Sequence, residues 1–311
     1  MALDEADRGP CSGRARDLIA KLEARARHIA FFGAGHAMAA NMAIAQFTGW
    51  NIPGVGEPGQ RRRPRTRIYA TDDPDTLRQV CETIDYANTA FVFVSDAAHG
   101  ATVHVQARAM LPSIRAALGS EAPAHVAGVV SGEPAAADPE LQSLIRAFGG
   151  EVLSVSGAAG ALSVHGQLVG IARGLDDVRV RAGARAVCER VTAGPVVDDG
   201  LGLPRAWLNP SGGGGSNRPP TRVIVAARDR LGMFAGWAAQ TWNTARASSK
   251  ASRRGGAATA PLIRDCGVAD VAASAATGVP QVLDVFDVAA DDRTPQTLSS
   301  ESDLPHRFTL L

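Results

Sequence analysis

Short hydrophobic runs recur along the first half of the chain, and each is followed by a segment with a helical pattern of apolar and polar positions. The runs are rich in β-branched and aromatic residues, which favours strands over buried helices. They are HIAFFGAG (28–35), RIYATD (67–72), TAFVFVSD (89–96) and HVAGVVSG (125–132). Strands that alternate with helices are typical of parallel βαβ units. The pattern therefore predicts an α/β fold, a three-layer αβα sandwich with a parallel sheet and helices on both faces.

The pattern of the later residues predicts a second, smaller unit. From about 158 to 192 it is helical, and NPSGGGGSNRPP (209–220) then has the composition of a flexible break. Strands follow at TRVIVAAR (221–228) and QVLDVFDV (281–288). We predict an α/β domain with C-terminal helices over 1–195, a reduced second α/β subdomain over 196–290, and a polar tail over 291–311 that is a surface wrap or disordered.

Composition excludes several classes of partner. The 311 residues include 32 basic and 31 acidic ones, and a net charge of +1 supplies no global field for nucleic acid or an anionic membrane. The cysteines lie far apart without a C-x-x-C pair, and no apolar stretch approaches the roughly 18 residues of a membrane span. The N-terminus shows no apolar signal segment. We expect a reduced, cytoplasmic setting, with neither nucleic acid nor membrane as a partner.

Two strand-to-helix turns place polar residues where ligands bind in parallel α/β sheets, outside the carboxyl ends of strands, and a later helix carries a polar face. FFGAGHA (31–37) joins a strand to a helix through Gly33 and Gly35, either as a tight turn or as a ligand loop. FVSDAAHGAT (93–102) is a second such turn, which could cradle a phosphate although Asp96 would repel it. The helix RDRLGMFAGWAAQTWNTARASSK (228–250) stacks Met233, Trp237, Gln240 and Thr244 on one face.

These segments, with ATDDPDTLRQVCETIDYANTAFVFVS (70–95) and ALSVHGQLVGIARGLD (161–176), resemble the glucose-6-phosphate isomerase family, especially the bacterial form fused to transaldolase. The resemblance runs from about residue 15 to residue 290 and rests on the order and spacing of the segments. It implies two sugar isomerase (SIS) subdomains, a homodimer whose sites take residues from both chains, and interconversion of aldose and ketose phosphates without a metal or other cofactor. It does not by itself imply that the activity is kept.

The family's anion-binding motifs are altered in this sequence. The loop S-K-T-x-T-T-x-E-T aligns with residues 95–103, which keep Ser95 but place Asp96 where the family has a lysine. This change reverses the charge that would meet a dianionic phosphate. The first loop, G-x-G-G-S, keeps Gly33 and Gly35 but brings in His36, and the segment aligned with G-G-R-Y-S (156–160) has no arginine.

The family's proton-transfer residues are also missing. The helix W-x-x-Q-L-x-x-E-S-x-G-K keeps Trp237 and Gln240, but Thr244 stands where the family has its glutamate base. A neutral hydroxyl cannot replace a carboxylate as general base. The ring-opening motif G-x-x-D-Q-H-S aligns with residues 267–273, which keep Asp270 and lack the histidine. We therefore expect the fold of the family without ordinary glucose 6-phosphate isomerisation.

The resemblance maps a set of candidate residues to the former isomerase cleft. The acid/base candidates are His36, His99, His165 and Asp270, and the ligand-binding candidates are Gly33, Gly35, Ser95, Asp96, Thr102, Gln240 and Thr244. Their spacings match no metal-ligand motif, so we interpret the polar ones as loop residues and predict neither metal nor cofactor. His28, His104, His125 and His306 are interpreted as structural or solvent-exposed.

Two alternatives stay open at the level of sequence. The basic stretches GQRRRPRTR (59–67) and KASRRGG (250–256) either clamp a phosphate or an acidic partner, or are solvated charge runs. The protein is either a diverged isomerase-like protein that binds a sugar-like or other small ligand in the cleft, or a catalytically silent scaffold or regulatory subunit. The alanines at the altered positions favour the second alternative slightly.

Overall fold

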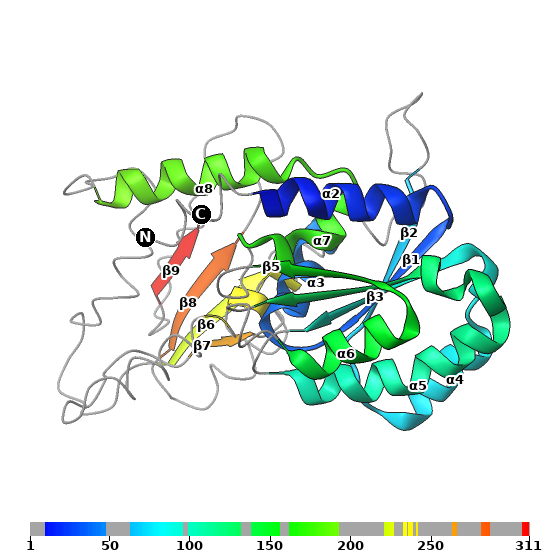
Figure 1. Ribbon diagram of the computed structural model, residues 1–311. Helices are drawn as coiled ribbons and strands as arrows, with labels where there is room; N and C mark the ends of the chain where they lie inside the picture. The colour runs from blue at the N-terminus through cyan, green and yellow to red at the C-terminus, as the bar shows by residue number, and fades with distance from the viewer. Residues whose placement is uncertain are drawn as a thin grey trace. The chain divides into compact units, whose positions relative to one another are not determined.

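The structure is a computed structural model (Figure 1) that describes residues 10–47, 63–95, 99–131, 138–155, 162–192, 221–226, 233–234, 236–238, 241, 263–265, 281–286 and 307–310. The chain divides into two compact units, Met1–Arg185 and Ala186–Leu311. Each unit is described by itself.

The first unit contains a five-stranded, fully parallel sheet. Its strands are β1 (His28–Gly33), β2 (Arg65–Tyr69), β3 (Thr89–Ser95), β4 (Val126–Ser131) and β5 (Glu151–Val155), in the spatial order β2-β1-β3-β4-β5. After β1 the chain first adds β2 on one side and then crosses to add β3 on the other. The strand order therefore reverses between β1 and β3, which is the switch point where doubly wound sheets bind ligands.

Helices cover both faces of this sheet, as Figure 1 shows, and this confirms the predicted three-layer αβα sandwich. One face carries α2 (Pro10–Glu23), α3 (Gly35–Phe47) and α7 (Val164–Ala172), and the other carries α4 (Pro74–Thr83), α5 (Gly100–Leu118) and α6 (Pro139–Phe148). Two short 3₁₀ segments, η1 (Tyr86–Asn88) and η2 (Gly119–His125), precede β3 and β4, and α8 (Asp177–Thr192) follows α7.

Two apolar cores lie on the two faces of the sheet. Side chains alternate along each strand, so Ile29 and Phe31 belong to the core under α2, α3 and α7, whereas Ala30 and Phe32 belong to the core under α4, α5 and α6. A strand buried on both faces is continuously apolar. For this reason β1, β3 and β4 are the strands that the hydrophobic pattern predicts most clearly.

The strand limits differ from the sequence prediction in two places. β2 begins at Arg65 rather than at residue 67, because Thr66 is buried and the segment pairs with β1 from its first residue. β5 was not predicted from the sequence. It is an edge strand in which Leu153 and Val155 are buried while Val152 and Ser154 are only partly buried, and its hydrophobic signal is correspondingly weak.

The second unit contains a four-stranded parallel sheet in the order β7-β6-β8-β9. Its strands are β6 (Thr221–Ala226), β7 (Ile263–Asp265), β8 (Gln281–Phe286) and β9 (Arg307–Leu310). The predicted strands near 221 and 281 are present. β9 lies in the segment expected to be a polar tail, where its short run of alternating residues follows a long polar stretch. No helix in the described part of the chain is long and apolar enough to cross a membrane.

Candidate functional site at the switch point

Gly33 and Ser95 end the two strands that flank the switch point. Gly33 lies beside Val94 in the sheet register, and Ser95 is the next residue of β3. A Cβ atom on Gly33 would lie 2.4 Å from the Met38 Cε atom and 2.8 Å from the Val94 carbonyl oxygen. Because such contacts are not tolerated, the end of β1 requires a glycine.

The two strand-to-helix turns that the sequence singles out meet at this edge. Gly35 begins α3 with φ of +70°, a conformation that favours glycine. A Cβ on Gly35 would lie only 2.1 Å from the His99 Nδ1 atom, so the half-buried imidazole lies directly against the glycine backbone. His99 is also the N-cap residue of α5, although its side chain makes no cap hydrogen bond. The structure therefore brings Gly33, Gly35, Ser95 and His99 to one edge of the sheet.

Asp138 organises the polar groups beside Ser95. The Ser95 hydroxyl donates to Asp138 Oδ2 at 2.5 Å, and the backbone N–H of Leu141 donates to Oδ1 at 3.0 Å, so Asp138 is also the N-cap of α6. His104 Nε2 lies 2.7 Å from the same Oδ1 atom. Burial alone would raise the pKa of Asp138, but the hydrogen bonds from Ser95, Leu141 and His104 outweigh it and lower the pKa. The carboxylate is therefore a fixed negative charge next to the end of β3.

The charges continue from Asp138 toward the surface. His104 Nδ1 lies 3.2 Å from a Glu140 carboxylate oxygen, and the other oxygen accepts a hydrogen bond from Arg108 Nη2 at 2.6 Å. The carboxylate of Asp138 lies between Ser95 and His104, whereas a serine nucleophile needs the imidazole in that middle position to take its proton. The arrangement orients side chains and sets the local charge, and it does not activate the serine.

Gln106 holds the carboxyl ends of β1 and β2 together. Its side chain is fully buried, and its Nε2 group donates to the carbonyl oxygens of Gly33 at 3.2 Å, Tyr69 at 3.2 Å and Thr71 at 2.7 Å. Neither Gln106 nor Asp138 was a candidate in the sequence analysis. Gln106 could have been found as a polar residue on the buried stripe of α5 with Val103 and Met110. Asp138 could have been found as the N-cap of an Asp-Pro helix start.

The other sequence candidates lie in varied surroundings. The Thr102 hydroxyl is 3.4 Å from an Asp72 carboxylate oxygen, so it lies near the end of β2 rather than beside Ser95. His36 is in the first turn of α3. His165 is in α7, on the sheet face opposite α5; its ring is completely buried and its carbonyl oxygen accepts a hydrogen bond from Asn41 Nδ2 at 2.9 Å.

Four of the candidates, Asp96, Gln240, Thr244 and Asp270, lie outside the described residues, as does the basic stretch 250–256. In the helix expected over 228–250, residues 233–234, 236–238 and 241 are helical, and the rings of Phe234 and Trp237 pack with centroids 5.3 Å apart. No group of three or more His, Cys, Asp or Glu side chains within the described ranges could hold a metal ion.

The histidines that the sequence left aside have distinct surroundings. His125 is structural, because its buried ring lies with Nδ1 3.0 Å from the Thr89 carbonyl oxygen at the start of β3. His104 is part of a polar network, since it lies between the carboxylates of Asp138 and Glu140.

Comparisons with known proteins place the fold. The chain is similar in structure to a hypothetical protein of Thermus thermophilus, with a TM-score of 0.66 and 16% identity over 96% of this chain and 74% of the other. It is also similar to a glucose-6-phosphate isomerase of Chlamydia trachomatis, with a TM-score of 0.65 and 17% identity over 88% of this chain and 52% of the other. The match thus spans about half the length of the chlamydial enzyme. No family profile matches the chain, and no curated protein matches it in sequence. At these identities the similarity establishes a phosphoglucose-isomerase-like (SIS) α/β fold.

Proposed function

We propose that this protein is a diverged phosphoglucose-isomerase-like protein that binds an uncharged or cationic sugar-like ligand at the switch point and does not carry out ordinary glucose 6-phosphate isomerisation. One observation carries the proposal. The hydroxyl of Ser95, which the sequence aligns with the start of the family's phosphate loop, donates to the buried and ionised Asp138.

The charge at this edge disfavours a sugar phosphate. A dianion next to the Asp138 carboxylate experiences a Coulomb repulsion of at least about 1 kcal/mol at the effective dielectric of a partly solvated site. Ser95 already donates its proton to Asp138, so a phosphate also loses a hydrogen bond of about 1 kcal/mol. The two effects together weaken phosphate binding by roughly one to two orders of magnitude. A neutral or cationic ligand experiences no such repulsion.

The same edge offers contacts to a polyol or an amine. The His99 ring fills the space beside Gly35, so a ligand at this edge would meet that ring rather than bare glycine backbone. The half-buried imidazole of His99 lies beside Gly35, and imidazole nitrogens are hydrogen-bonding groups of the kind that polyols contact. Asp138 and Glu140 add negative charge near this edge, although Arg108 pairs with Glu140.

A second function, a catalytically silent scaffold or regulatory subunit, is favoured by a different observation. Ser95, Asp138 and His104 bind one another, and His99 lies against Gly35, so the polar groups at this edge engage the protein itself. A site closed in this way has little need of a ligand. The two functions differ in whether any small molecule binds.

Calorimetric titration of the full chain with glucose, glucosamine and glucose 6-phosphate tests the proposal. We expect glucose or glucosamine to bind more tightly than glucose 6-phosphate, and His99→Ala to weaken that binding about tenfold. Val105→Ala, at an exposed position of the same helix, is the control and should change nothing. Preferential binding of glucose 6-phosphate would contradict the proposal, and absence of binding by the whole panel would favour the scaffold.

The catalytic half of the proposal needs a separate assay. We expect no conversion of glucose 6-phosphate to fructose 6-phosphate above the background of a mock purification. Thr244→Glu alone should not restore it, because a general base is of no use without phosphate anchoring and ring opening. Turnover by the wild-type chain above that background would contradict this half of the proposal.

A further inference from the structure

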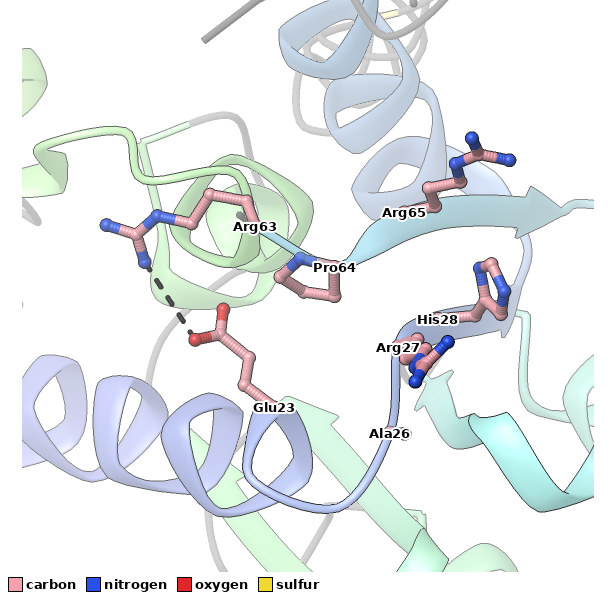
Figure 2. Close-up of a pocket in the computed structure, with 7 residues that line it drawn as sticks. All are labelled: Glu23, Ala26, Arg27, His28, Arg63, Pro64 and Arg65. Carbon is pink, nitrogen blue, oxygen red and sulfur yellow. Dashed lines mark ion pairs between the residues drawn. The ribbon is translucent and has the colours of Figure 1, made fainter. Parts of the chain in front are cut away.

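A pocket lies at the edge of the sheet opposite the switch point, where the strands begin. It has a volume of about 560 Å³ and is lined by Glu23, Ala26, Arg27, His28, Arg63, Pro64 and Arg65. These residues come from the connection between α2 and β1 and from the start of β2, as Figure 2 shows. Ligand pockets for small molecules have volumes of this order. The pocket lies away from the switch point, because the amino and carboxyl ends of parallel strands are at opposite edges.

Backbone pairing places the cationic residues at this edge next to one another. The backbone N–H of Arg65 donates to the Arg27 carbonyl oxygen at 3.0 Å, and that of Arg27 donates to the Asn88 carbonyl oxygen at 2.9 Å. His28 is the register partner of Arg65 in the sheet. Arg27, His28 and Arg65 are therefore held next to one another by the pairing of two strands, before any ligand is present.

The positive charge in this pocket is only partly compensated. The Arg63 Nη1 atom lies 3.9 Å from a carboxylate oxygen of Glu23, and Figure 2 shows Arg63 pointing toward Glu23. Arg27, His28 and Arg65 lie on the other side of Pro64. The described residues give the Arg27 and Arg65 side chains no ion pair and no hydrogen bond. Two guanidinium groups are thus available for a ligand.

The pKa of His28 is lowered in this positively charged pocket. Burial is the largest cause that lowers the pKa of His28, and the charges of Arg67, Arg65 and Arg27 lower it further. The carboxylate of Asp85, the N-cap residue of η1, raises it. Its buried Nδ1 atom has no hydrogen-bond partner among the described residues. An anion in the pocket would offset the arginine charges that lower the pKa of this imidazole.

We infer that the pocket formed by Arg27, His28, Arg63 and Arg65 is a binding site for a small phosphate-bearing anion. A guanidinium group can donate two parallel hydrogen bonds to phosphate oxygens, which makes arginine well suited to bind a phosphate group. A pocket of this size in a chain of net charge +1 suits a small molecule better than a nucleic acid, which needs an extended basic surface. The inference is independent of the function proposed for the switch point.

Titration of the full chain with inorganic pyrophosphate tests this site. We expect saturable binding that weakens with added salt and that falls by at least about tenfold in the double variant Arg27→Ala/Arg65→Ala. The control Arg14→Ala/Arg25→Ala removes the same charge from exposed positions that do not line the pocket, and it should bind like the wild type. Equal losses in both double variants, or no binding by the wild type, would overturn the inference.

A readout on the wild-type chain makes the test independent of any variant's folding. Nuclear magnetic resonance of the His28 ring should show its pKa rising when pyrophosphate is added, since the anion favours the charged imidazole. Binding without a change in the His28 titration would place the anion elsewhere and overturn the inference. Tighter binding of a DNA duplex than of pyrophosphate would overturn the assignment to a small anion.

Discussion

At the scale of single residues, the chemistry of the switch point is set by a few polar side chains that hydrophobic patterning does not reveal. The sequence indicated Gly33, Gly35, Ser95 and His99, because residues in the turn after a strand can be recognised without knowing their partners in space. It did not indicate Asp138 or Gln106. Their roles depend on partners such as Ser95 and Gly33, far away in sequence. Partners this far apart in sequence depend on the order of the strands in the sheet. That order cannot be read from the hydrophobic pattern of a single sequence.

Gly35→Ala should destabilise the protein by about 2 kcal/mol or more, because the positive φ strains any L side chain and the new Cβ would meet the His99 ring. Gly183→Ala is the matched control. Gly183 is exposed in α8, and a Cβ there meets nothing within 4 Å. That substitution should stabilise the protein by about 0.5 to 1 kcal/mol.

Urea unfolding midpoints of the two variants measure these effects. The expected shifts have opposite signs, so a general sensitivity to alanine substitution cannot produce the pair. A Gly35→Ala variant as stable as the wild type would show that His99 does not lie against this glycine.

At the scale of elements, predictability from the sequence follows burial. β1, β3 and β4 are apolar along their length because helices cover both of their faces, and their positions were predicted closely. The edge strands β2 and β5 alternate between buried and exposed residues, and the sequence misplaced the first and missed the second. An edge strand pairs with another strand along only one of its two edges. More of its surface therefore stays exposed, and its hydrophobic signal is weaker.

The attachment of α8 to α2 is a second feature of the elements that the sequence did not reveal. Asp177 begins α8 and accepts hydrogen bonds from Ser12, from Arg16 at 2.7 Å and from Arg181 at 2.6 Å. Asp177 and Arg181 are almost completely buried. Burial alone would raise the pKa of Asp177, but the bonds from Ser12 and Arg181 and the charge of Arg16 lower it. The ionised carboxylate thus links the two helices.

Asp177→Asn should lower the free energy of unfolding by about 3 kcal/mol at neutral pH, because it leaves the buried Arg181 without its counter-charge. The lowered pKa fixes the sign of the pH effect. The stabilisation is fully present above the unfolded-state pKa of about 3.9 and is lost as the pH falls through the folded-state pKa. The stability difference between wild type and variant should therefore be largest at neutral pH and shrink in acid.

Denaturant unfolding of both chains from neutral pH to below about pH 4 measures this difference. Asp75→Asn is the control, since the ion pair of Asp75 with Arg78 is exposed and should contribute less than about 1 kcal/mol. A stability difference that stays constant, or grows, as the pH falls would contradict the assigned role of Asp177.

At the scale of the whole molecule, the second unit is the part whose strands were least well predicted from the sequence. Its parallel sheet is built around β6 and β8, which the hydrophobic pattern located, whereas β7 and β9 are short and were not predicted. A parallel sheet normally needs cover on both faces, and the resemblance to the isomerase family implies that a second chain completes the sites and cores. The state of assembly is therefore the property of the whole chain that most needs measurement.

We predict that the full chain is a homodimer, because the sequence predicts a reduced second unit, whose apolar surface a second copy would cover by closed two-fold symmetry. Light scattering coupled to size exclusion should give twice the chain mass of 32.2 kDa. A dimer that persists at micromolar concentration requires an association free energy of about −8 kcal/mol. That energy needs a substantial apolar interface, so the measured mass should not fall when salt is raised. A mass of 32.2 kDa at micromolar concentration would contradict the prediction, and dissociation on adding salt would mean that charged groups rather than apolar surface hold the two copies together.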